Sequence, residues 1–156
     1  MRPKQFTLTA VKAAGDASLR LRYADGERFD VDLAALIEAH PTLERLRDAK
    51  VFGTAKVGEH GASVTWGGDD DLELAADNLR ARAVEQTGGV SHEFLWNWMA
   101  RYGLTLDAAA EALGVSRRML AYYRSGARPV PRTVALACLG WERARRAGAR
   151  AFAMAA

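Results

Sequence analysis

The stretch from Leu104 to Pro131, LTLDAAAEALGVSRRMLAYYRSGARPVP, restricts the fold of this chain more than any other stretch. Thr105 is suited to cap a helix, because its hydroxyl can accept a free backbone N–H in the first turn. Gly114 can adopt the left-handed conformation that ends a helix, and Ser116 can cap a second one. The apolar residues of the first helix recur at helical spacing: Leu106, Ala109, Ala110 and Leu113. Two capped helices joined at a glycine predict a helix-turn-helix.

The second predicted helix runs from Arg117 to Ser125 and ends at Gly126. Its two sides differ in chemistry. Val115, Leu120 and Tyr123 should face inward, since they follow the helical period. The outward side then consists of Arg117, Arg118, Ala121, Tyr122 and Arg124.

This stretch resembles the helix-turn-helix of the Cro/phage-repressor (XRE-like) class of bacterial DNA-binding domains. The residues that carry the resemblance are Thr105-Leu106, Ala109, Leu113-Gly114-Val115-Ser116, Leu120, Tyr123 and Ser125-Gly126. The resemblance implies that the second helix enters the major groove. It implies base contacts from Arg117, Arg118, Ala121 and Tyr122, with Ser116 and Arg124 nearer phosphate. Arg128 and Arg132 would contact the DNA backbone. Thr105 is the last of the residues that we expect to bind DNA. The class often has Gln where this chain has Asp107, whose carboxylate disfavours that phosphate contact.

Charge is distributed unevenly along the chain, whose formal net charge is +3. Residues 1–83 hold 12 basic and 14 acidic residues, whereas residues 84–156 hold 10 arginines and 5 acidic residues. Five arginines and no acidic residue lie between Arg117 and Arg132. A solvated arginine-rich surface is the plain interpretation of such a run. Combined with the helix-turn-helix register, it favours nucleic acid, because arginine suits phosphate and guanine.

The first half predicts an α+β fold, with a small, mostly antiparallel sheet and short helices. Alternating apolar residues predict strands over 5–14, 19–23 and 29–33, and Asp25-Gly26 predicts a hairpin between the last two. Further segments follow in order: helical turns at 33–40, 43–46 and 48–52, strands at 55–57 and 64–66, a solvated turn at 69–71, an edge segment at 72–74 and a helix over 77–85.

This half also resembles a family of small bacterial domains known as domain of unknown function 2442, over Phe6 to Arg82. The matching residues are Tyr23, Asp25-Gly26, Val31-Asp32, Leu46-Arg47-Asp48, Phe52, Val64, Trp66, Asp71-Leu72 and Leu79. The resemblance implies an α+β domain, sometimes fused to a helix-turn-helix, without an established activity.

Composition changes at Thr87-Gly88-Gly89, so we expect an α+β domain over 1–85, a linker over 86–91 and an all-α domain of about four helices over 92–156. Ser91 should cap a supporting helix that Gly103 ends, with Trp96 lying off its apolar face. Pro131 should be the first residue of the last helix, which runs to about Ala147. The expected buried stripe of that helix is Val134, Ala137, Cys138 and Trp141, widened by Leu136 and Leu139.

Several classes of protein are disfavoured. Cys138 is the only cysteine, so no disulfide can form within the chain. No apolar run approaches the length of a membrane span or signal peptide, so we expect a cytoplasmic protein. His40, His60 and His92 are far apart, and no metal-binding or phosphate-binding motif is present. We therefore expect no enzyme activity, no catalytic or metal site and no cofactor.

The sequence predicts a sequence-specific DNA-binding protein, a bacterial transcriptional regulator that reads the major groove with the helix after Ser116. Double-stranded DNA is the expected partner. A homodimer would supply a second half-site contact, and the acidic first domain would bind a protein partner or a second copy. The alternative is a protein–protein interaction module whose helix-turn-helix no longer binds DNA. Loss of Arg117 and Arg118 would discriminate the two.

Overall fold

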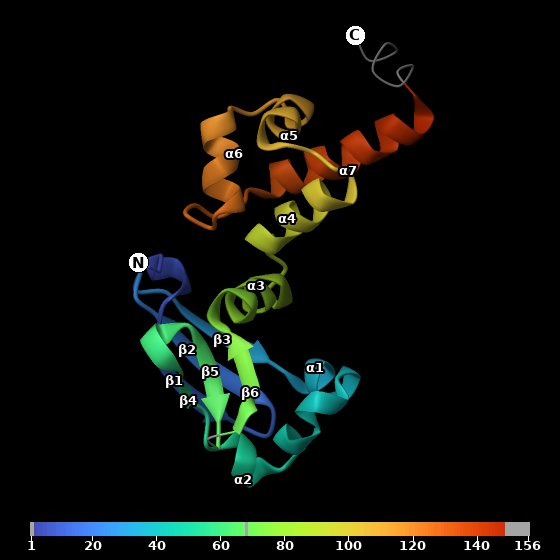
Figure 1. Cartoon of the computed structure of the whole chain (residues 1–156). Helices are drawn as coiled ribbons and strands as arrows, with labels where there is room; N and C mark the ends of the chain where they lie inside the picture. The colour runs from blue at the N-terminus through green and yellow to red at the C-terminus, as the bar shows by residue number, and fades with distance from the viewer. Residues whose placement is uncertain (1, 68, 149–156) are drawn as a thin grey trace. The chain divides into compact units, whose positions relative to one another are not determined.

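The computed structural model describes residues 2–67 and 69–148. The chain divides into two compact units, Met1–Gly88 and Gly89–Ala156 (Figure 1). The first unit holds two three-stranded antiparallel sheets with short helices, and the second unit is helical. The predicted α+β class is therefore confirmed.

The first sheet is a meander of β1 (Leu8–Ala14), β2 (Ser18–Tyr23) and β3 (Arg28–Asp32), with β2 in the centre. The hairpin predicted at Asp25-Gly26 is present. Gly26 has a φ of 91°, and the Asp25 carboxylate accepts the Glu27 N–H at 3.1 Å. Glycine adopts such a φ without the penalty that a Cβ imposes, so this turn sets the register of the hairpin.

The second sheet consists of β4 (Lys56–Val57), β5 (Ser63–Trp66) and β6 (Asp69–Ala75), again in chain order. The sequence predicted one sheet and a turn at 69–71, and both predictions are wrong. β6 begins at Asp69, which pairs with Trp66 of β5. Pairing with β5 and the burial of Leu72 outweigh the low strand propensity of three aspartates.

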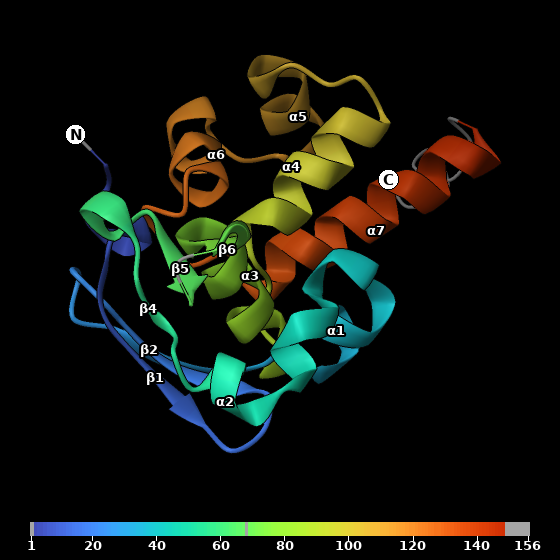
Figure 2. The same ribbon diagram turned by 60° about the horizontal axis from the view of Figure 1, so that its bottom comes forward.

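The helices of the first unit are α1 (Ala34–Ala39), α2 (Ala49–Phe52) and α3 (Ala76–Gln86), shown from two sides in Figure 1 and Figure 2. Short 3-10 turns cover Lys4–Phe6, Pro41–Arg47 and Glu59–Gly61. α1 begins one residue later than predicted, but the Asp32 carboxylate still accepts the Ala34 N–H at 2.8 Å. Asp48 caps α2 in the same way through the Lys50 N–H.

Both sheets contribute to one apolar core in the first unit. Its largest fully buried side chains are Trp66, Tyr23 and Phe52. The two polar atoms among them are satisfied, since Trp66 donates to the Phe52 carbonyl at 3.1 Å and Tyr23 donates to the Ala76 carbonyl at 2.7 Å. Buried polar groups need such partners, so these bonds fix how the core packs.

Arg80 of α3 fastens the hairpin end of the first sheet. Its guanidinium lies 2.8 Å from the Asp25 carboxylate and donates to the Gln5 carbonyl at 2.9 Å. The guanidinium carbon also lies 5.0 Å from the Tyr23 ring centroid and 4.9 Å from that of Phe29. One side chain thus joins α3 to the β2–β3 hairpin and to the N-terminal turn.

The second unit consists of α4 (His92–Arg101), α5 (Leu106–Leu113), α6 (Arg117–Arg124) and α7 (Arg132–Ala147). The core includes Leu95, Trp98, Met99, Ala109, Ala110, Leu120, Val134 and Cys138. Trp98, Tyr102 and Trp141 pack edge to face, with ring centroids 5.1–6.3 Å apart. This aromatic cluster joins α4 to α7, as the predicted stripes require.

Two predictions for α7 are wrong. Pro131 precedes the helix as its N-cap, and Arg132 is the first helical residue. Leu136 and Leu139 do not widen the buried stripe, because they are 54% and 53% exposed. The rest of α7 packs on the predicted side, with Val134 and Cys138 buried. A helix of this period has one inward side, and apolar residues outside that side remain in solvent.

Candidate nucleic-acid interface

α5 and α6 are capped as their sequence predicts. The Thr105 hydroxyl accepts the Ala108 N–H, and the Ser116 hydroxyl accepts the Met119 N–H, both at 3.1 Å. Gly114 ends α5 with a φ of 68°, in the left-handed region. Only three residues therefore separate the two helices, and the direction of α6 follows from these local bonds.

Packing determines which side of α6 faces solvent. Leu120 is fully buried against the core, and Tyr123 is half-buried beside it. Arg117 and Arg118, one turn earlier, are exposed. Of the outward set predicted from the sequence, Arg118 and Tyr122 lie on the side of α6 opposite Leu120. Ala121, Tyr122 and Arg124 are only partly exposed.

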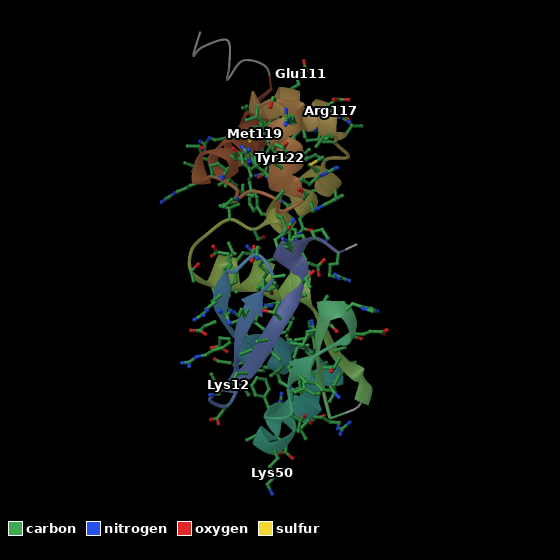
Figure 3. All side chains as sticks on the ribbon, turned by 90° about the vertical axis from the view of Figure 1, so that its left-hand side faces the viewer. Lys12, Lys50, Glu111, Arg117, Met119 and Tyr122 are labelled. Atoms are coloured by element: carbon green, nitrogen blue, oxygen red, sulfur yellow. The ribbon has the colours of Figure 1, made fainter. Side chains whose placement is uncertain are left out.

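Tyr122 organises the exposed side of α6 by contacting two arginines. Arg118 donates from Nε to the Tyr122 hydroxyl at 3.0 Å, and its guanidinium carbon lies 5.6 Å from the ring centroid. Arg128 places its guanidinium carbon 4.8 Å from the same ring and donates to the Met119 sulfur at 3.8 Å. Figure 3 shows Tyr122 and Met119 among the side chains of this region. The tyrosine therefore holds two cations at the surface, each with donors to spare, because a guanidinium has five N–H groups.

Arg117 is paired with an acidic residue of the preceding helix. Its Nε lies 2.8 Å from an oxygen of Asp107, and the two side chains are 66% and 77% exposed. Asp107, which stands where the XRE-like class often has Gln, therefore forms an ion pair with an arginine of the expected DNA-binding set. An ion pair exposed to this degree contributes only about 0.2–1 kcal/mol, so a phosphate can compete for the arginine.

The remaining predicted residues lie on α6, at the N-caps of α5 and α6 and at the start of α7. Arg124 stacks on the ring of Trp96, 4.4 Å from its centroid, which explains why that exposed tryptophan is tolerated at 50% exposure. Arg132 is exposed at the start of α7. The hydroxyls of Thr105 and Ser116 serve as caps, and each keeps its own O–H to donate.

The basic end of α7 is partly used in packing. The Arg145 guanidinium carbon lies 5.3 Å from the Tyr102 ring centroid and 5.2 Å from that of Trp141. Glu142 pairs with Arg101 of α4 at 3.3 Å. These contacts give Arg145 a structural role, which the helical pattern alone could not show.

Sequence reasoning missed Met119 and Trp96 as partners of the exposed arginines. Both residues lie off the apolar stripes that helical spacing reveals. What would have revealed these partners is the proximity, in the folded chain, of a cationic side chain to an aromatic ring or a thioether. Sequence spacing does not give that signal when the two side chains belong to different elements.

Two groups with raised pKa lie in the cores rather than at this surface. Burial raises the pKa of the Cys138 thiol to about 12, and Glu142 adds to the effect. Burial likewise raises the pKa of Tyr23 well above its ordinary value. Among residues 2–67 and 69–148, no group of three or more His, Cys, Asp or Glu side chains is placed to hold a metal ion. In the same part of the chain, no helix has the length and apolar character to cross a membrane.

The chain belongs to the family described as "Protein of unknown function (DUF2442)", whose model matches residues 8–85. It is also similar over nearly its whole length to a solved crystal structure, that of "Putative DNA Binding Protein NE0471 from Nitrosomonas europaea ATCC 19718". The two chains are 41% identical and superpose with a TM-score of 0.82, which covers 93% of this chain and 92% of the other. No curated protein matches the chain. The predicted DUF2442 membership is therefore confirmed, and the similarity to NE0471 extends through the second unit.

Proposed function

We propose that this chain is a sequence-specific DNA-binding protein and a bacterial transcriptional regulator, and that it acts by binding rather than as an enzyme. α5 and α6 would form a helix-turn-helix of the XRE-like class, with α6 in the major groove. The observation that carries the proposal is that Arg118 and Arg128 both contact Tyr122 at the surface of α6. The description of NE0471 as a DNA-binding protein supports it.

Arg118 lies in the first turn of α6, the part of a recognition helix that reaches base edges. Its Nε is occupied by the Tyr122 hydroxyl, which leaves the two terminal nitrogens for a bidentate contact with guanine. Arg124, Arg128 and Arg132 would contact phosphates and thereby fix the register. Thr105 and Ser116 would donate their hydroxyl protons to phosphates at the helix N-termini.

One such helix reads only a few base pairs, so specificity requires a second copy on a second half-site. The proposal therefore includes a homodimer on DNA. The first unit would then bind a protein partner or a second copy, in addition to the role argued below.

The alternative function is a protein–protein interaction module that has lost DNA binding. The Asp107–Arg117 pair favours it, because a carboxylate lies 2.8 Å from an arginine that DNA would otherwise engage. The two functions differ in what the α6 arginines do. In the DNA-binding function they contact a base edge and phosphates, and in the alternative they are solvated surface.

The test measures binding of the full chain to two labelled duplexes, one of random sequence and one from upstream of its own gene, over a salt series. For Arg117→Ala/Arg118→Ala we expect a large loss of affinity and of preference for the upstream duplex, because Arg118 is assigned to a guanine. The salt slope should become shallower by about 0.9, for the phosphate contact of Arg117. Arg143→Ala/Arg146→Ala is the matched control, because it removes the same charge from exposed positions on α7.

Preference for the upstream duplex together with loss of binding in the α6 variant supports the proposal. An unchanged salt slope in the α6 variant contradicts the assigned role of α6. Absence of binding by the unaltered chain at low salt favours the interaction module. Circular dichroism of each variant checks that the helices are retained.

A further inference from the structure

The outer face of the first sheet carries a group of basic side chains. Register defines this face, because residues directly opposite each other on neighbouring strands point to the same side. Arg22 lies opposite Arg28 and Ala10, and Arg20 lies opposite Lys12 and Asp30. The other face carries Val11, Leu21 and Phe29 and packs on the core. We call the side defined by Ala10, Lys12, Arg20, Arg22, Arg28 and Asp30 the outer sheet face.

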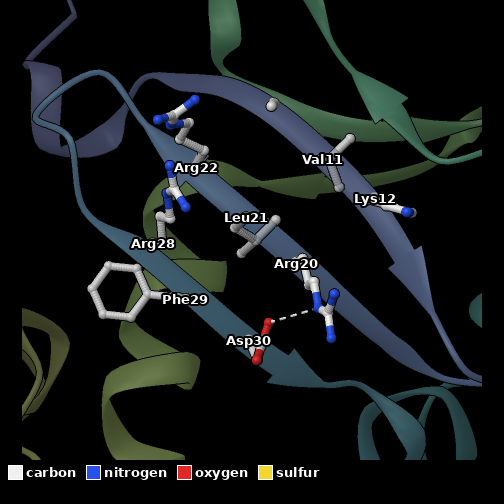
Figure 4. A pocket seen from close by; sticks show the side chains of 9 residues that line it. Val11, Lys12, Arg20, Leu21, Arg22, Arg28, Phe29 and Asp30 are labelled. Carbon is white, nitrogen blue, oxygen red and sulfur yellow. Dashed lines mark ion pairs between the residues drawn. The ribbon is translucent and has the colours of Figure 1, made fainter.

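The outer sheet face is hollowed. Residues of all three strands line a hollow of about 390 Å³ (Figure 4). Ala10 and the longer side chains of Lys12, Arg22 and Arg28 are among the residues that line it. In Figure 4 the guanidinium groups of Arg22 and Arg28 project from neighbouring strands on the same side of the sheet.

The cations of this face outnumber the acidic groups that balance them. Arg20 pairs with Asp30 at 3.6 Å. Over the part of the chain that the structure describes, Lys12, Arg22 and Arg28 form no ion pair. Like charges directly opposite each other on antiparallel strands destabilise a sheet, so the stability of the fold does not favour Arg22 facing Arg28.

The net charge of the first half does not reveal the basic character of this face. Residues 1–83 are slightly acidic in total, which favoured a protein partner for this unit. Arg20 and Arg22 are two residues apart on one strand, so both project from one side, about 6.8 Å apart. The alternation that buries Leu19 and Leu21 therefore also collects the basic residues of β2 on the opposite face.

We propose that the outer sheet face is a second DNA contact, which binds the phosphate backbone of a duplex. The inference rests on the proposed function. Arginine matches phosphate through its planar fork of donors. Three cations that form no ion pair among the described residues give the face a charge complementary to DNA. Phe29 also lines the hollow, but by register it belongs to the other side of the sheet, where it packs against the core. The outer sheet face itself therefore presents no aromatic ring on which a base could stack, which favours a duplex over a single strand.

The experiment compares the full chain with Arg22→Gln/Arg28→Gln on one random-sequence duplex over a salt series. Each lost phosphate contact makes the slope of log affinity against log salt shallower by about 0.9, so the variant should lose about 1.8. At 0.1 M salt, the same relation predicts an affinity loss of up to about 60-fold. Lys50→Gln/Lys56→Gln is the matched control, since both lysines are exposed in the same unit but lie outside this face. Arg22→Lys/Arg28→Lys tests rescue by charge.

A shallower slope in the Arg22/Arg28 variant, an unchanged slope in the control and recovery with lysine support the proposal. An unchanged slope in the Arg22/Arg28 variant overturns it, and so does an equal change in the control. A changed sedimentation coefficient of the free protein with an unchanged DNA slope also overturns it, because the face then binds a second copy.

Arg117→Ala/Arg118→Ala, measured beside these variants, separates this proposal from the function of α6. If only the α6 variant loses binding, the sheet contact is wrong and the proposed function stands. If only the sheet variant loses binding, the sheet contact stands and the role of α6 is wrong. If the unaltered chain binds no duplex at low salt, both are wrong.

Discussion

Replacing Asp107 with asparagine should strengthen binding to DNA. The Asp107 carboxylate lies 2.8 Å from Nε of Arg117, at the start of α5. In the DNA-bound state proposed above, this carboxylate has two unfavourable effects: it repels nearby phosphates, and it competes with them for Arg117. Asparagine keeps the shape of the side chain and removes the charge, so both effects should disappear.

The size of the effect can be worked out for a carboxylate assumed to lie about 8 Å from each of three phosphates. One charge about 8 Å from a phosphate in water gives about 0.5 kcal/mol, which screening at 0.1 M salt reduces to roughly 0.2 kcal/mol. Three such phosphates give about 0.7 kcal/mol, and release of an exposed ion pair adds about 0.2–1 kcal/mol. The sum corresponds to roughly a 5- to 20-fold gain in affinity, since about 1.4 kcal/mol is tenfold.

Fluorescence anisotropy with a labelled random-sequence duplex, from 50 mM to 1 M salt, measures this change. The gain should be largest at low salt and fade at high salt, because the interactions are screened. Glu38→Gln is the control, because it removes the same charge from an exposed position on α1. The free energy of unfolding should change by no more than about 1 kcal/mol, since Asp107 is exposed and lies at a helix N-terminus.

Equal or weaker binding by Asp107→Asn at low salt would refute this reasoning. Weaker binding would mean that Asp107 aims Arg117 at its target instead of competing for it. An equal gain in Glu38→Gln would mean that only the net charge of the chain matters.

Three further predictions concern stability. Arg80→Met should lower the unfolding free energy of the first unit by about 2–4 kcal/mol in chemical denaturation, because Arg80 is 16% exposed and its loss leaves Asp25 without its ion-pair partner; an effect below 0.5 kcal/mol contradicts the role given to Arg80. Gly114→Ala should destabilise by about 1–2 kcal/mol because of its φ of 68°, whereas Gly140→Ala, inside α7 with open space around it, should stabilise by about 0.5–1 kcal/mol; melting curves that move in the same direction for both contradict the backbone argument. Because the folded state raises the pKa of Cys138 to about 12, the stability that this thiol contributes is fully present below pH 9 and is lost as pH rises toward 12, by up to about 1.4 kcal/mol per pH unit. Cys138→Ala should remove this part of the dependence of unfolding free energy on pH between pH 8 and pH 11, and an identical dependence in the variant contradicts the assignment.

Local signals predicted most of the elements correctly. The hairpin at Asp25-Gly26 and the caps at Thr105 and Ser116 depend on a few neighbouring residues, so the sequence contains what is needed to place them. The outward side of α6 followed from the helical period in the same way. These signals concern one element at a time.

Contacts between elements could not be predicted from spacing. The position of Asp69 in β6 depends on pairing with β5, which outweighs its local preference for a turn. Leu136 and Leu139 are apolar but exposed, because the core of the second unit meets α7 on one side only. The stacking of Arg124 on Trp96 and the pairing of Arg117 with Asp107 join helices whose packing no sequence pattern describes.

The positions of the four tryptophans give the two units separate optical signals. Trp66 is the only tryptophan before Gly88, and it is fully buried, so its emission reports the packing of the first core. Trp98 and Trp141 pack edge to face in the aromatic cluster of the second unit, where energy transfer between the two rings should accompany the folded state. Trp96 is half exposed and lies under Arg124. If a phosphate draws Arg124 away, the emission of Trp96 changes, so the unlabelled protein carries its own indicator of DNA binding.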